Sequence, residues 1–179
     1  MSLLKIASMT CIALTLGACQ SVFQASAPKP LAVTPDASEQ LKAGCKGQDC
    51  PLVNIDTVHF ADEPKLDALI EARLLKMTVN SPEDKLAPSL NAYREQFLRT
   101  AQSRYSSYLQ AKVREQHDGL VIVELSSYLD TGGAHGMPGR GFINYSRKDQ
   151  KEVTLQDMLV PGQEKAFWAA GKVAHNNWL

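Results

Sequence analysis

The chain has 179 residues, of which 44% are hydrophobic and 21% are charged, and this composition suits one globular domain behind an N-terminal segment. Its 19 Lys and Arg side chains are balanced by 19 Asp and Glu side chains. Because no basic stripe is available to neutralise phosphates, we expect no nucleic-acid partner.

Residues 1–18 have the pattern of a lipoprotein signal peptide. Lys5 supplies the positive start, and residues 6–16 form an apolar run too short to span a membrane as a mature helix. The run ends in Leu-Gly-Ala-Cys, typical of a lipobox in which the Cys19 thiol receives a diacylglycerol. An ordinary secretory signal with a coincidental cysteine is the alternative. Two or three acyl chains give stable anchoring, and Gln20, in place of Asp, favours the outer membrane, facing the periplasm.

A flexible tether is predicted for residues 19–44. Pro28, Pro30 and Pro35 lie there among small and polar residues with no apolar period. The folded domain is therefore predicted to span residues 45–179.

Two cysteines open that domain. Cys45 and Cys50 remain as an even pair once Cys11 leaves with the leader and Cys19 is lipidated. In an oxidising periplasm the pair predicts a disulfide. A metal site is the alternative, although no third and fourth ligand lies nearby in the sequence.

The first half of the domain is predicted to contain one strand and two helices. Leu52–Phe60 has strand character, and a helix follows the cap residue Asp62. The next helix is predicted from Pro88 or Ser89 to about Leu109, with an aromatic stripe that we interpret as core in preference to a sugar-stacking platform. The residues expected on the two apolar helix faces are Leu66, Leu69, Ile70, Leu74 and Met77, and then Leu90, Tyr93, Phe97, Ala101, Tyr105 and Tyr108.

The second half is predicted to be mainly strands. Ala111–Gln116 leads through the hairpin turn Asp118-Gly119 into Leu120–Leu129, and Gly141–Arg147 returns. Further predictions are a helix cap at Thr154 with Asp157, core positions at Val153, Leu155, Met158 and Leu159, and a last helix at Ala166–Val173. This order predicts a single α+β domain with an antiparallel sheet backed by two or three helices.

The stretch from Leu120 to Leu159 organises the chain. Alternation predicts one buried face, with Val121, Val123, Leu125, Ser127 and Leu129, and one wet face, with Glu124, Ser126 and Tyr128. The turn that follows has five glycines between positions 132 and 141, with His135 among them. We expect Gly132 and Gly133 to adopt backbone conformations that a β-carbon would strain.

Catalytic chemistry is not expected. The four histidines (His59, His117, His135 and His175) show no zinc-ligand spacing, and the Ser126-Ser127 pair lacks a nucleophile elbow. Asp130 and His135 could face each other across the turn for acid–base work. We prefer a structural interpretation, in which Asp130 caps turn amides and His135 donates to a backbone carbonyl. No catalytic residue, metal or cofactor is therefore predicted, and the protein is expected not to be an enzyme.

The second half of the chain resembles a known family. It is similar to a domain of unknown function in bacterial envelope proteins, which also forms the extracellular part of RsiV-type anti-sigma factors and an accessory region of some peptidoglycan deacetylases. The resemblance covers roughly residue 51 to the C-terminus. The features that carry it, in order, are Tyr128, Gly132–His135, Asn144, Tyr145 and Leu155–Leu159. The family implies further strands after the last of these, so the chain is either truncated or a variant without them.

The resemblance also implies a function, because this region binds lysozyme in the anti-sigma factors. We interpret the protein as an outer-membrane-anchored periplasmic lipoprotein, a binding module for a lysozyme-type protein or peptidoglycan. Without the leader's Lys5 the charges are 18 basic against 19 acidic, so capture of a basic lysozyme would depend on a local acidic patch such as Asp130 with Glu124. The alternatives are an accessory module for peptidoglycan hydrolysis or deacetylation and a purely structural lipoprotein. The predicted binding residues are Tyr128, Asp130, Gly132, Gly133 and His135.

Overall fold

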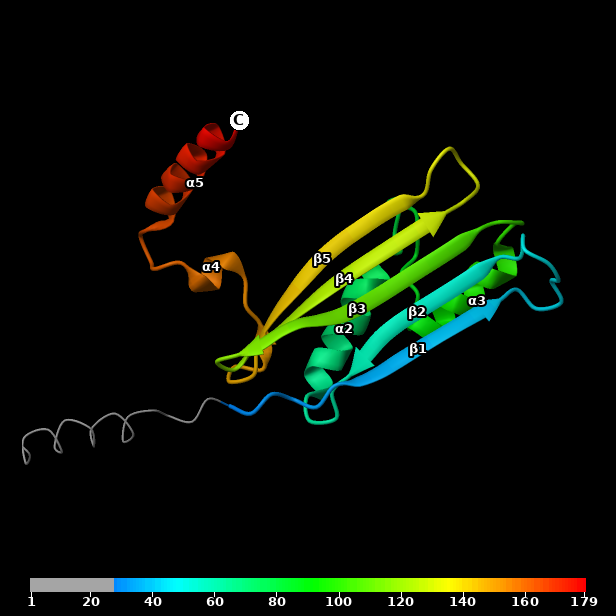
Figure 1. Cartoon of the computed structure of the whole chain (residues 1–179), viewed down its shortest axis with the longest axis horizontal. Coiled ribbons are helices and arrows are strands. Elements are labelled where there is room, and N and C mark those ends of the chain that lie inside the picture. The colour runs from blue at the N-terminus through cyan, green and yellow to red at the C-terminus, as the bar shows by residue number, and fades with distance from the viewer. Residues whose placement is uncertain (1–27) are drawn as a thin grey trace, which may run out of the picture. The chain divides into compact units, whose positions relative to one another are not determined.

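The structure, a computed structural model, describes residues 28–179 and contains one α+β unit over Leu31–Leu179 (Figure 1). This confirms the predicted fold class. Cys19 and the signal-peptide prediction lie outside the described residues. Within the described range, no helix is both long and apolar enough to cross a membrane.

The sheet of this unit follows the chain in space, in the order β1-β2-β3-β4-β5-β6. The strands are β1 (Thr34–Leu41), β2 (Leu52–His59), β3 (Ser106–His117), β4 (Leu120–Asp130), β5 (Met137–Ser146) and β6 (Lys151–Glu152). All neighbours are antiparallel except β2 and β3, which are parallel. A parallel pair needs a long crossover, and α2 (Pro64–Lys76) and α3 (Leu90–Thr100) supply it.

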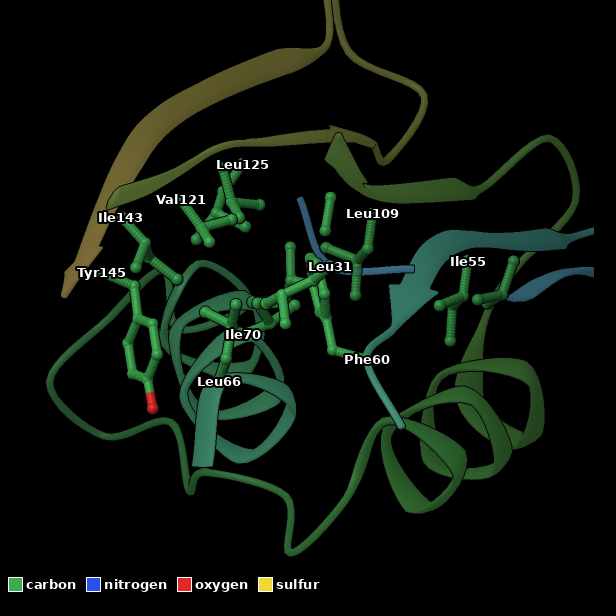
Figure 2. Packing of buried hydrophobic residues seen from close by; sticks show 14 of the residues in the cluster. Leu31, Ile55, Phe60, Leu66, Ile70, Leu109, Val121, Leu125, Ile143 and Tyr145 are labelled. Atoms are coloured by element: carbon green, nitrogen blue, oxygen red, sulfur yellow. The ribbon is translucent and has the colours of Figure 1, made fainter. Parts of the chain in front are cut away.

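One face of the sheet packs against these two helices and contains the core (Figure 2). The expected apolar face of α2 is confirmed, because Leu66, Ile70 and Leu74 are at most 2% exposed. The alternation of β4 is confirmed too, since Val121 and Val123 are fully buried. Burying each such side chain stabilises the fold by about 1.5–3 kcal/mol before the entropic cost of ordering it.

Part of the predicted tether belongs to the folded domain, because residues 34–41 form β1. This strand pairs with β2 from Thr34↔His59 to Leu41↔Leu52. Leu31 is buried, and its backbone N–H donates to Gln116 Oε1 at 2.7 Å. A domain start at residue 45 was therefore wrong. β1 is an edge strand with mostly exposed side chains, so it joins the sheet through backbone pairing and leaves no apolar pattern in the sequence.

The loop between β1 and β2 holds the predicted disulfide. Cys45 and Cys50 are bonded, with their Cα atoms 5.7 Å apart. This confirms the disulfide interpretation over the metal site. The bridge closes a loop that the pairing of β1 with β2 already holds at both ends, because Lys42 N–H donates to Pro51 O at 2.9 Å.

The second helix is shorter than predicted. Its start is confirmed, since the Ser89 side chain caps α3 by accepting from Ala92 N–H. The helix ends at Thr100, however, and Tyr108 lies on β3. The three-residue spacing of Tyr105 and Tyr108 fits the apolar face of a helix, which is why the helix was extended to them. The chain instead turns before Ser106, and the residues of β3 then alternate between the two faces of the sheet. At the first helix, the cap position is held by Glu63 and not by Asp62.

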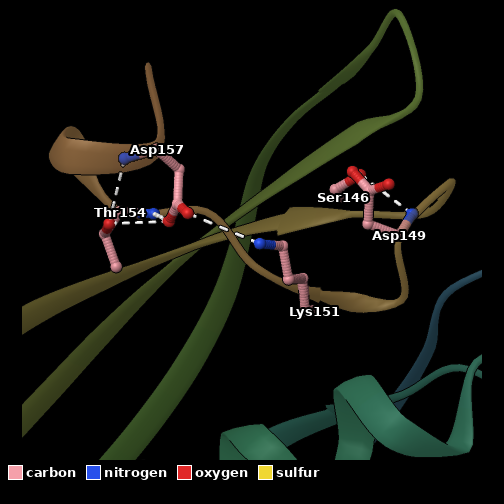
Figure 3. A network of polar contacts seen from close by, with 5 residues as sticks. All are labelled: Ser146, Asp149, Lys151, Thr154 and Asp157. Atoms are coloured by element: carbon pink, nitrogen blue, oxygen red, sulfur yellow. Dashed lines mark hydrogen bonds and ion pairs between the residues drawn. The ribbon is translucent and has the colours of Figure 1, made fainter. Parts of the chain in front are cut away.

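After β6 the chain forms α4 (Leu155–Met158) and α5 (Glu164–Trp178). Thr154 and Asp157 form the predicted capping box, and Lys151 Nζ donates to Asp157 Oδ1 at 3.4 Å (Figure 3). The core role of this segment was wrong, because Leu155 is 46% and Met158 64% exposed, and Val153 and Leu159 are only partly buried. An amphipathic pattern predicts a helix but does not specify what covers its apolar side.

Candidate functional site

The sheet face opposite α2 and α3 carries three cross-strand rows of side chains, and we call it the open face. Register places the rows across neighbouring strands. They are Asn54–Tyr108–Tyr128–Pro138, Asp56–Gln110–Ser126–Arg140 and Lys112–Glu124–Phe142. Three aromatic side chains stay substantially exposed there: Tyr108 at 39%, Tyr128 at 40% and Phe142 at 51%.

The first two rows line a shallow hollow of about 480 Å³, which we call the tyrosine hollow. Its aromatic part is the pair Tyr108 and Tyr128, whose rings meet edge to face with centroids 6.3 Å apart. This geometry is favourable for two π systems. It also fixes the two rings at an angle to each other on the open face.

Gly136, in the loop between β4 and β5, lies against the ring of Tyr128. A β-carbon at this position would overlap the end of the ring that carries the hydroxyl. The glycine therefore lets the loop backbone pack on Tyr128. Any side chain here would push the ring aside.

The other glycines of this stretch differ in backbone conformation and in the contacts that a β-carbon would make. Gly132 has φ +77°, as predicted, but Gly133 does not have a positive φ and has only ordinary contacts, so that expectation was wrong. At Gly139 a β-carbon would overlap Ser127 Oγ and lie 3.2 Å from Met77 Cε, on the helix-covered face. The sequence showed the cluster of glycines but not which contact each one serves.

The second row supplies the polar side of the tyrosine hollow. Gln110 Nε2 donates to Asp56 Oδ2 at 2.7 Å. In the first row, Asn54 Nδ2 donates to Glu39 Oε2 at 3.1 Å. These bonds hold planar polar groups in set orientations beside the two tyrosines.

Glu124 forms the third feature of the open face. It accepts a hydrogen bond from Arg114 Nε at 2.5 Å, and it forms an ion pair with Arg140, whose Nη1 lies 2.9 Å from Glu124 Oε1. The hydrogen bond from Arg114 is the main cause that lowers the pKa of Glu124, and burial opposes it. A β-bulge between Val113 and Glu115 inserts Arg114 as the extra residue of its strand.

This arrangement corrects two expectations. Glu124 was predicted to be wet, yet it is only 7% exposed because the two arginines cover it. An acidic patch of Asp130 with Glu124 was also expected, but the two positive charges of Arg114 and Arg140 exceed the single negative charge of Glu124.

The remaining predicted binding residues stabilise the loop itself. Asp130 Oδ1 accepts from Gly132 N–H at 2.8 Å, and His135 Nδ1 lies 3.1 Å from Gly136 O, where it can only donate. Each side chain thus has the structural role that we preferred. Of the five predicted residues, only Tyr128 lines the hollow.

Residues 28–179 contain no cluster of three or more His, Cys, Asp or Glu side chains able to hold a metal ion. His59 pairs with Asp67 at 2.5 Å, but Asp67 also accepts from Phe60 N–H at 2.9 Å and so anchors the start of α2.

Sequence reasoning missed Tyr108, Gln110, Asp56 and Arg140 as members of one site. The alternation of β3 was a usable signal for the first two, but the helix prediction concealed it. Asp56 and Arg140 join them only through strand pairing, which no local pattern reveals.

Comparison with known proteins identifies the family of this chain. No family model and no curated protein matches the chain. The chain is similar to a DUF3298 family protein from Pseudomonas aeruginosa PAO1 whose crystal structure is known, with 63% sequence identity and a TM-score of 0.78. The match covers 84% of this chain and 67% of that protein's chain. The chain belongs to the DUF3298 family.

A second DUF3298 structure, from Bacteroides fragilis NCTC 9343, is 15% identical with a TM-score of 0.54, and so shares the fold. It covers 76% of this chain and 64% of its own. DUF3298 is a family of unknown function, so membership shows the fold and a relation to bacterial proteins but does not indicate an activity. This agrees with the resemblance to an envelope domain of unknown function.

Proposed function

We propose that this DUF3298 protein is an outer-membrane-anchored periplasmic lipoprotein whose domain is a non-enzymatic binding module, and that its partner docks on the open face. The observation that carries the proposal is a sheet face whose exposed aromatic side chains pack against each other and against a loop. Aromatic residues in fixed positions provide contact area at low entropic cost. Tyr108 and Tyr128 meet that description through their mutual contact and the packing of Gly136.

The charge of the open face bears on the choice of partner. Arg114 and Arg140 flank Glu124, and Gln110 covers one oxygen of Asp56. A face without an excess of acidic groups gives little attraction toward a strongly basic protein. It therefore favours a cell-wall partner over a lysozyme-type protein, and an accessory role in peptidoglycan hydrolysis or deacetylation is the second candidate.

The anchor is proposed from residues 1–19. Cys19→Ala should prevent acylation and leave the protein out of the membrane fraction. The check is metabolic labelling with a palmitate analogue together with membrane fractionation. A mutant that is still acylated and membrane-bound would refute the lipobox.

The binding proposal is tested with the full chain in detergent micelles, incubated separately with isolated peptidoglycan and with lysozyme. We expect co-sedimentation with peptidoglycan, co-purification with lysozyme, or both. The double variant Tyr108→Ala/Tyr128→Ala should lose this binding, and Met158→Ala, which truncates a more exposed apolar side chain on α4, should retain it. Absence of binding to both partners, or equal binding by the double variant, would contradict the proposal.

A further inference from the structure

We infer that the tyrosine hollow binds one pyranose ring of the wall glycan, with an N-acetylated hexosamine as its ligand class. The inference rests on the proposed binding function and specifies its site and ligand. Size is the first argument. A hollow of about 480 Å³ lies within the range of small-ligand sites, whereas a protein partner needs about 800 Å² of contact on each side.

The aromatic part of the hollow suits the apolar face of a sugar. The C–H groups of a pyranose carry small positive partial charges, and the face of an aromatic ring is negative. Tyr108 and Tyr128 are 39% and 40% exposed and lie edge to face. One ring can therefore lie under the sugar while the other borders it.

The polar part of the hollow suits the edge of the same sugar. Gln110 uses one amide N–H on Asp56, which leaves its carbonyl oxygen as an acceptor and the second carboxylate oxygen of Asp56 as another. Arg140 forms an ion pair with Glu124, and its guanidinium has five N–H donors. Acceptors and donors of this kind match vicinal hydroxyls and the N–H and C=O of an acetamido group.

Charge and rigidity complete the argument. Of the two charged groups of the hollow, Arg140 is paired with Glu124 and Asp56 accepts a hydrogen bond from the Gln110 amide, so both are already engaged and neither requires a charged ligand. The centre of a protein interface is instead depleted in charged residues. Because Gly136 packs on Tyr128, the ring is held before the ligand arrives, which reduces the ordering cost of binding.

The test uses the full chain in detergent micelles, titrated by calorimetry with soluble N-acetylglucosamine oligomers. We expect saturable binding that Tyr128→Ala and Gln110→Ala each weaken at least about tenfold, the loss expected for one stacked ring or one satisfied polar group. Phe142→Ala is the matched control, because Phe142 is exposed on the same face but lies outside the hollow. It should leave the dissociation constant within about twofold.

A second pair of variants tests the positioning of Tyr128. Gly136→Ala should displace the ring and weaken oligomer binding several-fold while the melting temperature changes little, because the clash is with a partly exposed side chain and not with the core. Gly133→Ala, in the same loop without a close contact, should change neither quantity.

The possible results separate the two proposals. Binding of peptidoglycan or lysozyme without any binding of the oligomers would overturn the sugar site and leave the binding module standing. Oligomer binding that Tyr128→Ala and Gln110→Ala do not weaken would also overturn the site. Failure of all three probes would overturn both proposals.

Discussion

Ile143 and Phe142 are neighbours on β5, yet they lie on opposite faces of the sheet. Ile143 is fully buried among the side chains of the helix-covered face, and Phe142 is 51% exposed on the open face. The same strands thus carry the core on one side and, on the other, aromatic and paired polar groups that the core does not need. The buried apolar side chains are concentrated on the covered face, so side chains of the open face can change with less effect on the stability of the fold.

The largest expected difference is between those two residues. Ile143→Ala should lower the free energy of unfolding by about 2–5 kcal/mol, because it leaves a cavity in the core. Phe142→Ala should cost less than about 1 kcal/mol, since half of its ring is already in water. Urea denaturation of both variants measures the difference. Equal losses would mean that the open face is part of the stabilising core.

The second contrast is between two glycines of β5, because their replacement by Ala should change the free energy of unfolding in opposite directions. Gly139→Ala should cost about 1–3 kcal/mol, because its β-carbon would overlap Ser127 Oγ on the covered face. Gly141→Ala meets no atom within 4 Å, and should stabilise the strand by about 0.5–1 kcal/mol by reducing the freedom of the unfolded chain. Thermal unfolding monitored by circular dichroism provides the readout. A loss at Gly141 as large as that at Gly139 would show that the space beneath β5 is filled.

Alkaline pH should act on the covered face through Tyr145. Burial, then the hydrogen bond from its hydroxyl to Glu63 Oε2 at 3.1 Å, raises the pKa of Tyr145 to about 12. The unfolded chain releases this proton near pH 10, so folding stability should fall as the pH rises from 10 toward 12. In Tyr145→Phe that part of the decline should be missing when melting temperatures are compared across this range. An unchanged slope would show that Tyr145 is not the group that titrates.

Acidic pH should act on the open face through Glu124, and this is the smallest effect. Its pKa is lowered from 4.5 in the folded chain, mainly by the hydrogen bond from Arg114. The ion cluster therefore stabilises the fold above the unfolded pKa, and that contribution disappears as the pH falls through the lower, folded pKa. Glu124→Gln should melt below the parent protein at pH 7 and approach it at pH 3. A gap that persists in acid would indicate lost packing instead of lost charge.

Much of the fold could be predicted from the sequence wherever the relevant contacts are local. The alternation of β4, the apolar face of α2 and the cap of Thr154 with Asp157 each depend on residues a few positions apart. Asp118 and Gly119 both have positive φ, at +48° and +79°, as their hairpin turn requires. The lipobox at Cys19 is local too, and stays a prediction.

The candidate site was harder to predict, because its members come from four strands. Tyr128 was correctly expected on an exposed face, but Asp56 reaches it only through the parallel pairing of β2 with β3. Asp130 and His135 attracted attention as polar residues in a glycine turn, although both serve the backbone of their own loop.

By itself the sequence determined the periodicities, caps, turns and the cysteine pair, since each of these is decided by neighbours along the chain. Only the tertiary structure decided that residues 34–41 join the sheet, that Glu124 lies between two arginines and that Gly136 packs on Tyr128. These features depend on backbone pairing and on contacts between distant segments. Backbone pairing is available to almost any side chain, so it leaves no mark in the sequence that could have been read in advance.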